Sequence, residues 1–325
     1  MKPRWKAFGI LSGLLIGSVL LLTAYMASMG YFELDTIEVV ETHVFEGDLE
    51  LSVNNDFGLV EVKTWERTNV EIVGIKKTLF GEEELEKIGF VVEKTDGFKV
   101  TGKRDGGATW VWMDLKIKIP RTMNVSSLSS ENGRIEASGI RGDFDVRVEN
   151  GEIDMENIEG NISLKSTNGR INLKESHGNF TLETENGDIY TTNVENILSA
   201  ETENGWVHIY ESAWVGSASS ENGEVWVKRT THLDKAETEN GEVIVQVYDV
   251  PVSGMRLRTS NGRVDVTIPE TLAVNYTIDV RNGDIRFRGF DDDSREGSEN
   301  YGHLNGGGPQ IDIEVVNGDV YLRGE

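Results

Sequence analysis

The stretch LETENGDIY (182–190) contains the unit whose repetition decides the fold. Its core, ETENG, returns at 201–205 and at 237–241. Asn-Gly itself recurs in six successive steps of 18 residues, then in two steps of 21, and once more near the C-terminus. The asparagines of this series are Asn132, Asn150, Asn168, Asn186, Asn204, Asn222, Asn240, Asn261, Asn282 and Asn317. A fixed period near twenty residues predicts a solenoid in which each period forms one coil.

Within one period, apolar and polar side chains alternate. The third residue after the Asn is always Ile or Val between positions 135 and 243, and the fourteenth is Val, Leu or Ala between 146 and 236. Such alternation is typical of strands with one buried face. Stacked periods would form parallel sheets with about 4.8 Å between neighbouring strands. The sequence therefore predicts an all-β protein, a parallel β-solenoid (β-helix) with rungs of 18–21 residues.

The Asn-Gly pair is expected to form a corner of each coil. Asn186 shares strand parity with Leu182 and Thr184, so we expect it to point inward. Stacked amides can then hydrogen-bond to one another along the axis, and the Gly can supply a positive φ. A hairpin turn is the alternative interpretation of Asn-Gly, but antiparallel pairing gives no reason for a strict 18-residue register.

The N-terminus carries a separate signal. Residues 7–29 (AFGILSGLLIGSVLLLTAYMASM) are uncharged, and Lys2, Arg4 and Lys6 precede them. A run of this length can cross a membrane as a single helix, with the basic flank in the cytoplasm and the rest of the chain outside. A cleaved signal peptide is the alternative, although its apolar core is usually shorter.

Three parts are expected along the chain. Residues 1–30 would form a basic tip and membrane anchor, and residues 31–120 an atypical β-rich cap with one short helix (EEELEKIG, 82–89). Residues 121–325 would form the solenoid, with a loop inserted at 290–310 and a final strand, VYLRGE (320–325). An uncapped last rung could join copies end to end through that strand.

The order GDLELSVNNDFGLVEV, a charged helix, IKIP and then the Asn-Gly rungs resembles a large family of bacterial and archaeal surface proteins known as putative adhesins. The resemblance covers about residues 31–325 and implies a β-helix of unknown function associated with the cell envelope, with some relatives linked to envelope stress. It supplies no catalytic residues.

Charge and composition exclude several functions. The net charge of −24 argues against nucleic-acid binding, and the chain has no Cys. Its five His residues show no metal-ligand spacing, so no catalytic residues and no required cofactor are predicted. One column of acids directly precedes the corner Asn on successive rungs. These carboxylates could repel one another and recruit Ca²⁺, although a solvated polar face is the simpler interpretation. The members of this column are Glu185, Glu203, Glu221 and Glu239.

Aromatic residues gather on neighbouring rungs. Tyr190, His208 and Trp226 are each the fourth residue after an Asn, while Trp206 and Tyr210 lie beside His208 on the same outward parity. Outward Trp and Tyr side chains on a rigid sheet can stack on sugars or contact a protein partner. Trp110 and Trp112 also share strand parity, which is typical of packing within a cap.

These observations predict a membrane-anchored, extracytoplasmic β-helix that serves as a non-catalytic adhesion or binding module for a glycan or a surface protein. A self-associating scaffold or an envelope-stress protein is the alternative. An enzyme acting on acidic polysaccharides is a third interpretation.

Overall fold

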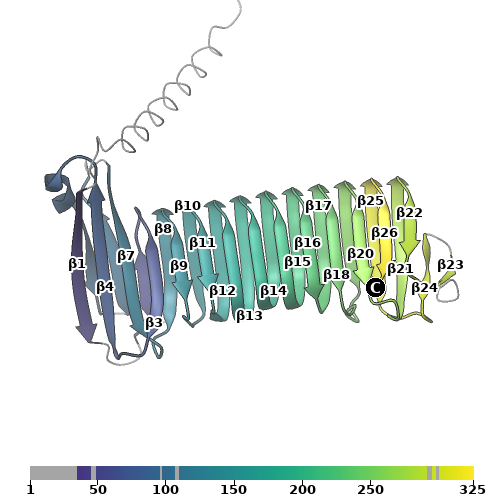
Figure 1. The fold of residues 1–325 in the computed structure, drawn as a ribbon, viewed down its shortest axis with the longest axis horizontal. Helices are drawn as coiled ribbons and strands as arrows, with labels where there is room; N and C mark the ends of the chain where they lie inside the picture. Colours follow the sequence, from purple (N-terminus) through teal and green to yellow (C-terminus); the bar gives the residue numbers. More distant parts are fainter. Residues whose placement is uncertain (1–34, 45–48, 96, 107–109, 291–294, 298–299) are drawn as a thin grey trace, which may run out of the picture.

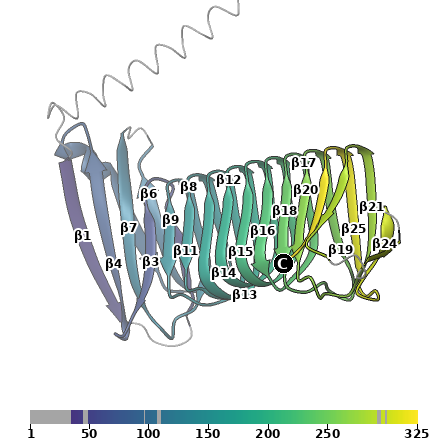
Figure 2. The same cartoon turned by 45° about the vertical axis from the view of Figure 1, so that its right-hand side comes forward.

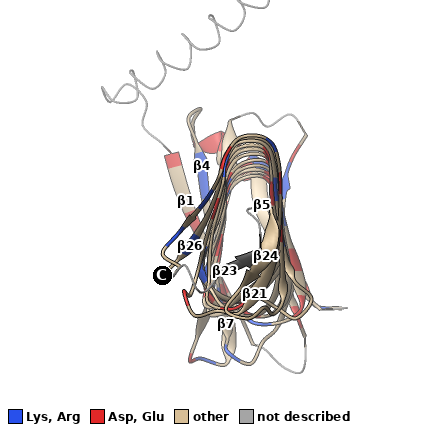
Figure 3. Cartoon of the chain, turned by 90° about the vertical axis from the view of Figure 1, so that its right-hand side faces the viewer, with Lys and Arg blue, Asp and Glu red and all other residues tan. Residues whose placement is uncertain are grey.

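The computed structural model describes residues 35–44, 49–95, 97–106, 110–290, 295–297 and 300–325. The described chain is almost entirely β-strand, and the strands stack side by side into one long solenoid with an antiparallel cap at its N-terminal end (Figure 1). The predicted membrane segment lies outside the described residues. Seen along its axis, the solenoid is a flattened, closed tube (Figure 3).

Each coil contributes strands to two faces that meet at the Asn-Gly corner. We call face 1 the strands that end at the corner Asn: β8 (Val125–Asn132), β10 (Phe144–Asn150), β12 (Glu159–Asn168), β17 (His232–Asn240), β19 (Met255–Asn261), β25 (Gln310–Asn317) and β21 (Val274–Asn282). Face 2 comprises the strands that follow the corner: β9 (Ile135–Ser138), β11 (Ile153–Glu156), β16 (Val225–Thr230), β18 (Val243–Val247), β20 (Val264–Ile268), β26 (Val320–Gly324) and β22 (Ile285–Arg288). Three strands run around the coil from face 2 to face 1: β13 (Ile171–Asn186), β14 (Ile189–Asn204) and β15 (Val207–Asn222).

Neighbouring coils pair in parallel with equivalent residues side by side. Ile171 pairs with Ile189, which pairs with Val207, and all three are fully buried. The apolar positions of every coil thus form columns that fill the tube, and burial of these columns is the main stabilising contribution. The predicted parallel strand stacking is confirmed.

The corner asparagines form a continuous amide ladder along the outside of the tube. Each donates Nδ2–H to Oδ1 of the neighbouring Asn over 2.9–3.1 Å, from Asn150 on Asn132 to Asn282 on Asn317. The expected inward orientation is wrong, because these asparagines are exposed. Strand alternation stops at the corner: Thr184 is buried, and the next two residues, Glu185 and Asn186, both face solvent.

Glycine is required at the corner because the backbones of neighbouring coils approach closely there. A Cβ added to any of them would lie 1.7–2.2 Å from the carbonyl oxygen of the glycine on the neighbouring coil. The expected positive φ is found at only some of these corners: Gly151, Gly262, Gly283 and Gly318 have φ of 151–159°, whereas Gly205 is not among the positive-φ residues. Left-handed φ values of 48–67° also occur on six successive coils at the point where the chain leaves face 2, in a column formed by Gly139, Asn157, Glu175, Asn193, Glu211 and Arg229.

A second ladder lies just inside the corner. Buried Ser and Thr hydroxyls two residues before the Asn donate to the corner Gly carbonyl of the preceding coil over 2.8–3.1 Å. The donors are Ser166, Thr184, Thr202, Ser220, Thr238 and Thr259. These bonds satisfy polar groups at the edge of the core, where an unpaired group is costly.

The N-terminal cap covers the first coil, which is formed by β2 (Leu51–Asn54) and β3 (Val60–Trp65). This coil lies between β8 and β9 on one side and β6 (Phe98–Arg104) and β7 (Val111–Pro120) on the other. Antiparallel strands then extend the cap: β5 (Ile88–Glu93) on β6, β4 (Asn69–Thr78) on β7, and β1 (Asp35–Val44) on β4. The predicted short helix is a 3-10 helix, η1 (Glu82–Lys87).

At the C-terminal end, the coils do not stack in chain order. Strands β25 and β26, the last coil of the chain, lie between β19–β20 and β21–β22 (Figure 2). The segment expected as a loop contains β23 (Arg295–Gly297) and β24 (Tyr301–Leu304), and β24 pairs antiparallel with the outer edge of β21. The final strand VYLRGE is therefore paired on both sides, and the prediction that it joins copies end to end is wrong.

Replacing Gly205 with Ala should lower the free energy of unfolding by at least about 2 kcal/mol, because the new Cβ would lie 2.0 Å from the Gly187 carbonyl oxygen. The control is Gly106→Ala, where a Cβ would meet no atom of the described residues within 4 Å. Urea denaturation of residues 31–325 followed by circular dichroism measures both. Equal stability of the two variants would contradict the close-approach argument.

Replacement of two buried threonines with Val should change the free energy of unfolding in opposite directions. Thr191 Oγ1 is buried without a hydrogen-bond partner in the described part of the chain, whereas Thr202 Oγ1 donates to Gly187 over 2.8 Å. We expect Thr191→Val to raise the free energy of unfolding by about 1 kcal/mol and Thr202→Val to lower it by about 1 kcal/mol. Chemical denaturation tests the pair, and a loss of stability in Thr191→Val would refute the first expectation.

Candidate functional site

An aromatic column runs along the outer side of face 2. Tyr190, His208 and Trp226 are in register on three successive coils. On the central coil, the flanking Val207 and Ile209 are buried, so strand alternation turns the His208 ring outward. The structure thus places these three residues side by side, as the repeat spacing predicts.

The rings stack on one another. The His208 imidazole lies 4.6 Å from the Trp226 ring and 5.6 Å from the Trp206 ring, with 18° between the planes in both cases. Tyr190 meets His208 edge-on at 5.2 Å. We call Tyr190, Trp206, His208 and Trp226 the aromatic cluster. Its Trp206 side is open to solvent, with 47% of that residue exposed.

Two cations border the aromatic cluster. Lys228 Nζ lies 4.0 Å from the centre of the Trp226 ring, an attractive cation–π geometry. The Arg229 guanidinium lies 5.2 Å from the Tyr210 ring and donates to its hydroxyl over 2.6 Å. Hydrogen bonds to the hydroxyls of Tyr210 and Tyr248 raise the pKa of Arg229. Tyr210 therefore belongs to the same surface, but it contacts Arg229 rather than the stacked rings.

Asp188 positions the cluster from the corner of its coil. Its Oδ1 accepts the backbone N–H of Trp206 over 2.9 Å, and its Oδ2 accepts the Tyr190 hydroxyl over 3.3 Å. Burial, together with this carboxylate, raises the pKa of Tyr190. The sequence alone does not identify this role of Asp188. Its position two residues before Tyr190, on the same strand face, was the available signal.

Two polar atoms of the cluster are unsatisfied. His208 Nε2 and Trp226 Nε1 are shielded from solvent and have no hydrogen-bond partner among the described residues. Burial lowers the pKa of His208, and this effect outweighs the opposing influence of Asp188. The neutral imidazole is therefore the favoured form in the folded chain.

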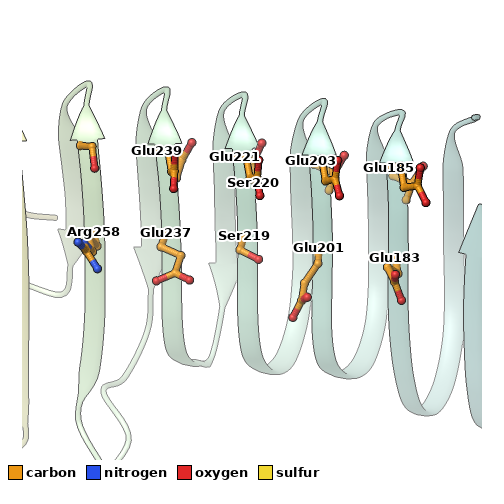
Figure 4. A pocket seen from close by; sticks show the side chains of 14 residues that line it. Glu183, Glu185, Glu201, Glu203, Ser219, Ser220, Glu221, Glu237, Glu239 and Arg258 are labelled. Carbon is orange, nitrogen blue, oxygen red and sulfur yellow. The ribbon is translucent and has the colours of Figure 1, made fainter. Parts of the chain in front are cut away.

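The predicted glutamate column lies on face 1. Glu185, Glu203, Glu221 and Glu239 follow one another along the stack, beside a second column that contains Glu183, Glu201 and Glu237 (Figure 4). Together with the intervening Ser and Thr side chains, they line a shallow hollow of about 440 Å³. Arg258 marks the end of the hollow on the C-terminal side.

The glutamate column has no preformed metal site. Among the described residues, no three His, Asp or Glu side chains are close enough together to hold one ion. The carboxylates occupy equivalent positions on separate coils and are exposed. The hollow is thus an acidic surface on which equivalent carboxylates recur from one coil to the next.

A family model described as Toastrack DUF4097 matches residues 50–323. The chain belongs to this family. The match covers the solenoid with its aromatic cluster and the cap apart from β1, and it confirms the resemblance inferred from the Asn-Gly rungs and the Ile-Pro entry. No curated protein matches the chain.

Solved structures similar to this DUF4097 chain include a putative cell adhesion protein from Clostridium sporogenes, with 11% identity and a TM-score of 0.20 over 90% of this chain and 100% of that one. A putative adhesin from Parabacteroides distasonis has 8% identity and a TM-score of 0.36 over 90% and 98%. A putative adhesin from Bacteroides fragilis has 13% identity and a TM-score of 0.31 over 90% and 97%.

Acid should destabilise the chain through His208. In the unfolded chain its pKa returns to about 6.5, so the unfolded state binds a proton more readily than the folded state. The contribution of the uncharged His208 ring to the free energy of unfolding is complete above pH 6.5. It is lost as the pH falls toward the lowered pKa of His208 in the folded chain. Wild type should therefore lose stability relative to His208→Tyr between pH 7.5 and pH 5.5. Parallel pH dependences of the two unfolding free energies would contradict the assignment.

Proposed function

We propose that this DUF4097 chain is a non-catalytic binding module that recognises a surface glycan, or a protein partner, through the aromatic cluster and Tyr210. The observation that carries the proposal is the ring stack of Trp206, His208 and Trp226 on an exposed strand face, with Trp206 left 47% exposed.

The fold does not require these rings. Asn172 and Ile244 occupy the equivalent outward positions on the coils at either end of the column, and the stack continues through them in unbroken register. The unsatisfied atoms of His208 and Trp226 are costly to stability. Local departures from the rules of a stable fold are expected at functional sites.

The surface chemistry suits a sugar. Indole and phenol rings offer flat apolar area on which the C–H face of a pyranose can stack, and their polar groups tolerate water. Lys228 and Arg229 add hydrogen-bond donors beside the rings. A rigid parallel sheet holds these groups in place before the ligand arrives, which reduces the entropy cost of binding.

The geometry of His208 favours binding over catalysis. A nucleophilic or general-base site needs the imidazole within hydrogen-bond reach of the group that it activates. Here Nε2 has no hydrogen-bond partner among the described residues, and both indole contacts are through ring stacking.

We also propose that the N-terminal segment anchors the module to the cell membrane, with the solenoid on the outside. The support is the 23-residue uncharged run at 7–29 and the Lys2, Arg4 and Lys6 that precede it. Within the part of the chain that the structure describes, no helix has the length and apolar character of a membrane span.

Replacing Trp206 with Ala should weaken glycan binding at least tenfold, about 1.4 kcal/mol, because it removes the exposed stacking surface. A glycan array first identifies a ligand for residues 31–325, and calorimetry then compares the affinities. Leu198→Ala is the matched control, since Leu198 is 45% exposed and lies on face 1. Equal loss in both variants, or none in Trp206→Ala, would exclude the aromatic cluster as the binding surface.

A further inference from the structure

A second pair of exposed aromatic side chains lies in the cap, far along the chain from the aromatic cluster. Phe80 and Trp110 are each 60% exposed, and their ring centres are 6.2 Å apart. The expectation that Trp110 packs inside the cap is wrong, because β7 begins one residue later and the indole is left outside the strand alternation. Both side chains are thus more than half open to solvent in the described part of the chain.

The backbone of Trp110 is unusual as well. Its φ is +64°, in the left-handed region that bulky residues rarely adopt. Such conformations persist where the surrounding structure imposes them, and they are common at functional positions. Here the conformation places an indole beside Phe80 at the surface.

Both rings lie where the chain enters the fold. Asp35, the first residue of β1, pairs with Thr78 at the end of β4, and Thr78 pairs with Val111 at the start of β7. Phe80 follows Thr78 by two residues and Trp110 directly precedes Val111. Figure 1 shows the start of β1, the end of β4 and the start of β7 at one edge of the cap.

Chain length limits how far this edge can be from the anchor. Six Cα–Cα steps, through five intervening residues, connect the end of the apolar run at Met29 to Asp35. Even fully extended, they span no more than about 20 Å. The edge that carries Phe80 and Trp110 must therefore lie within that distance of the membrane that holds the anchor.

We propose that Phe80 and Trp110 insert into the interfacial layer of the lipid bilayer and fix the orientation of the cap on the membrane. This inference rests on the anchor of the proposed function. Tryptophan is enriched at headgroup depth, where its apolar ring and its N–H group are both accommodated. An exposed Trp–Phe pair held beside a membrane entry point has this chemistry.

The contact is apolar rather than electrostatic. Three acids, Glu82–Glu84, begin η1 directly after the Phe80 turn. The nearby lysines have partners: Lys77 pairs with Asp114, and Lys87 with Glu84. A surface of this charge gains nothing from anionic lipids, so zwitterionic phosphatidylcholine is the appropriate probe.

The experiment uses the full chain in phosphatidylcholine vesicles that carry bromine near the glycerol end of the acyl chains, and it measures quenching of tryptophan fluorescence. Trp5 lies beside the anchor in sequence, so a Trp5→Phe background is used. We expect Trp110→Phe to remove more than half of the quenching, because Phe keeps an aromatic side chain at this position but does not contribute to the measured tryptophan fluorescence. Trp206→Phe is the matched control and should leave the quenching unchanged.

Bromine at the ends of the acyl chains should quench less than bromine near the glycerol, as expected for headgroup depth. If Trp110→Phe leaves shallow quenching unchanged while the protein remains bound to the vesicles, the inference is wrong and the anchor stands. If the protein does not remain with the vesicles, both the anchor and the inference are wrong. Circular dichroism verifies that each variant is folded.

Discussion

At one corner of every coil, the backbone passes so close to the coil before it that no β-carbon can be accommodated. The glycine there meets a neighbouring carbonyl at a distance that only hydrogen tolerates. The same carbonyl accepts a buried Ser or Thr hydroxyl on several coils, and the adjacent Asn side chains bond to one another outside. Three interactions at one corner therefore fix the register of the coils, and this register places the apolar side chains of successive coils in columns inside the tube.

A stack with its register fixed at the corner leaves the outward positions of the strands free to vary. Face 1 carries acids at these positions on successive coils (Figure 4), whereas face 2 carries Tyr190, His208 and Trp226. Because equivalent positions of successive coils lie side by side, the residue type chosen for one position of the repeat sets the chemistry of a whole column along the axis. In this way one fold can present two chemically different surfaces on opposite sides of a narrow core.

The 18-residue spacing was enough to predict parallel coils, the columns of buried residues and the grouping of the aromatic rings. It did not predict that the asparagines are exposed, because two consecutive corner residues, Glu185 and Asn186, abandon strand alternation. It also did not predict the left-handed column, whose members include Glu175 and Arg229, since these residue types carry no turn preference. The role of Asp188 depends on contacts between coils, which a pattern within one coil cannot reveal.

The step from Asn240 to Asn261 equals the step from Asn261 to Asn282, yet the last coil of the chain is inserted between the latter two. This interleaving has a consequence for biogenesis. During synthesis, coils up to Ile268 can assemble in order as they emerge, but β21 and β22 cannot take their final neighbours until β25 and β26 arrive. Completion of the stack therefore waits for residues 310–324, and a chain that stopped before them would lack an internal layer of the stack.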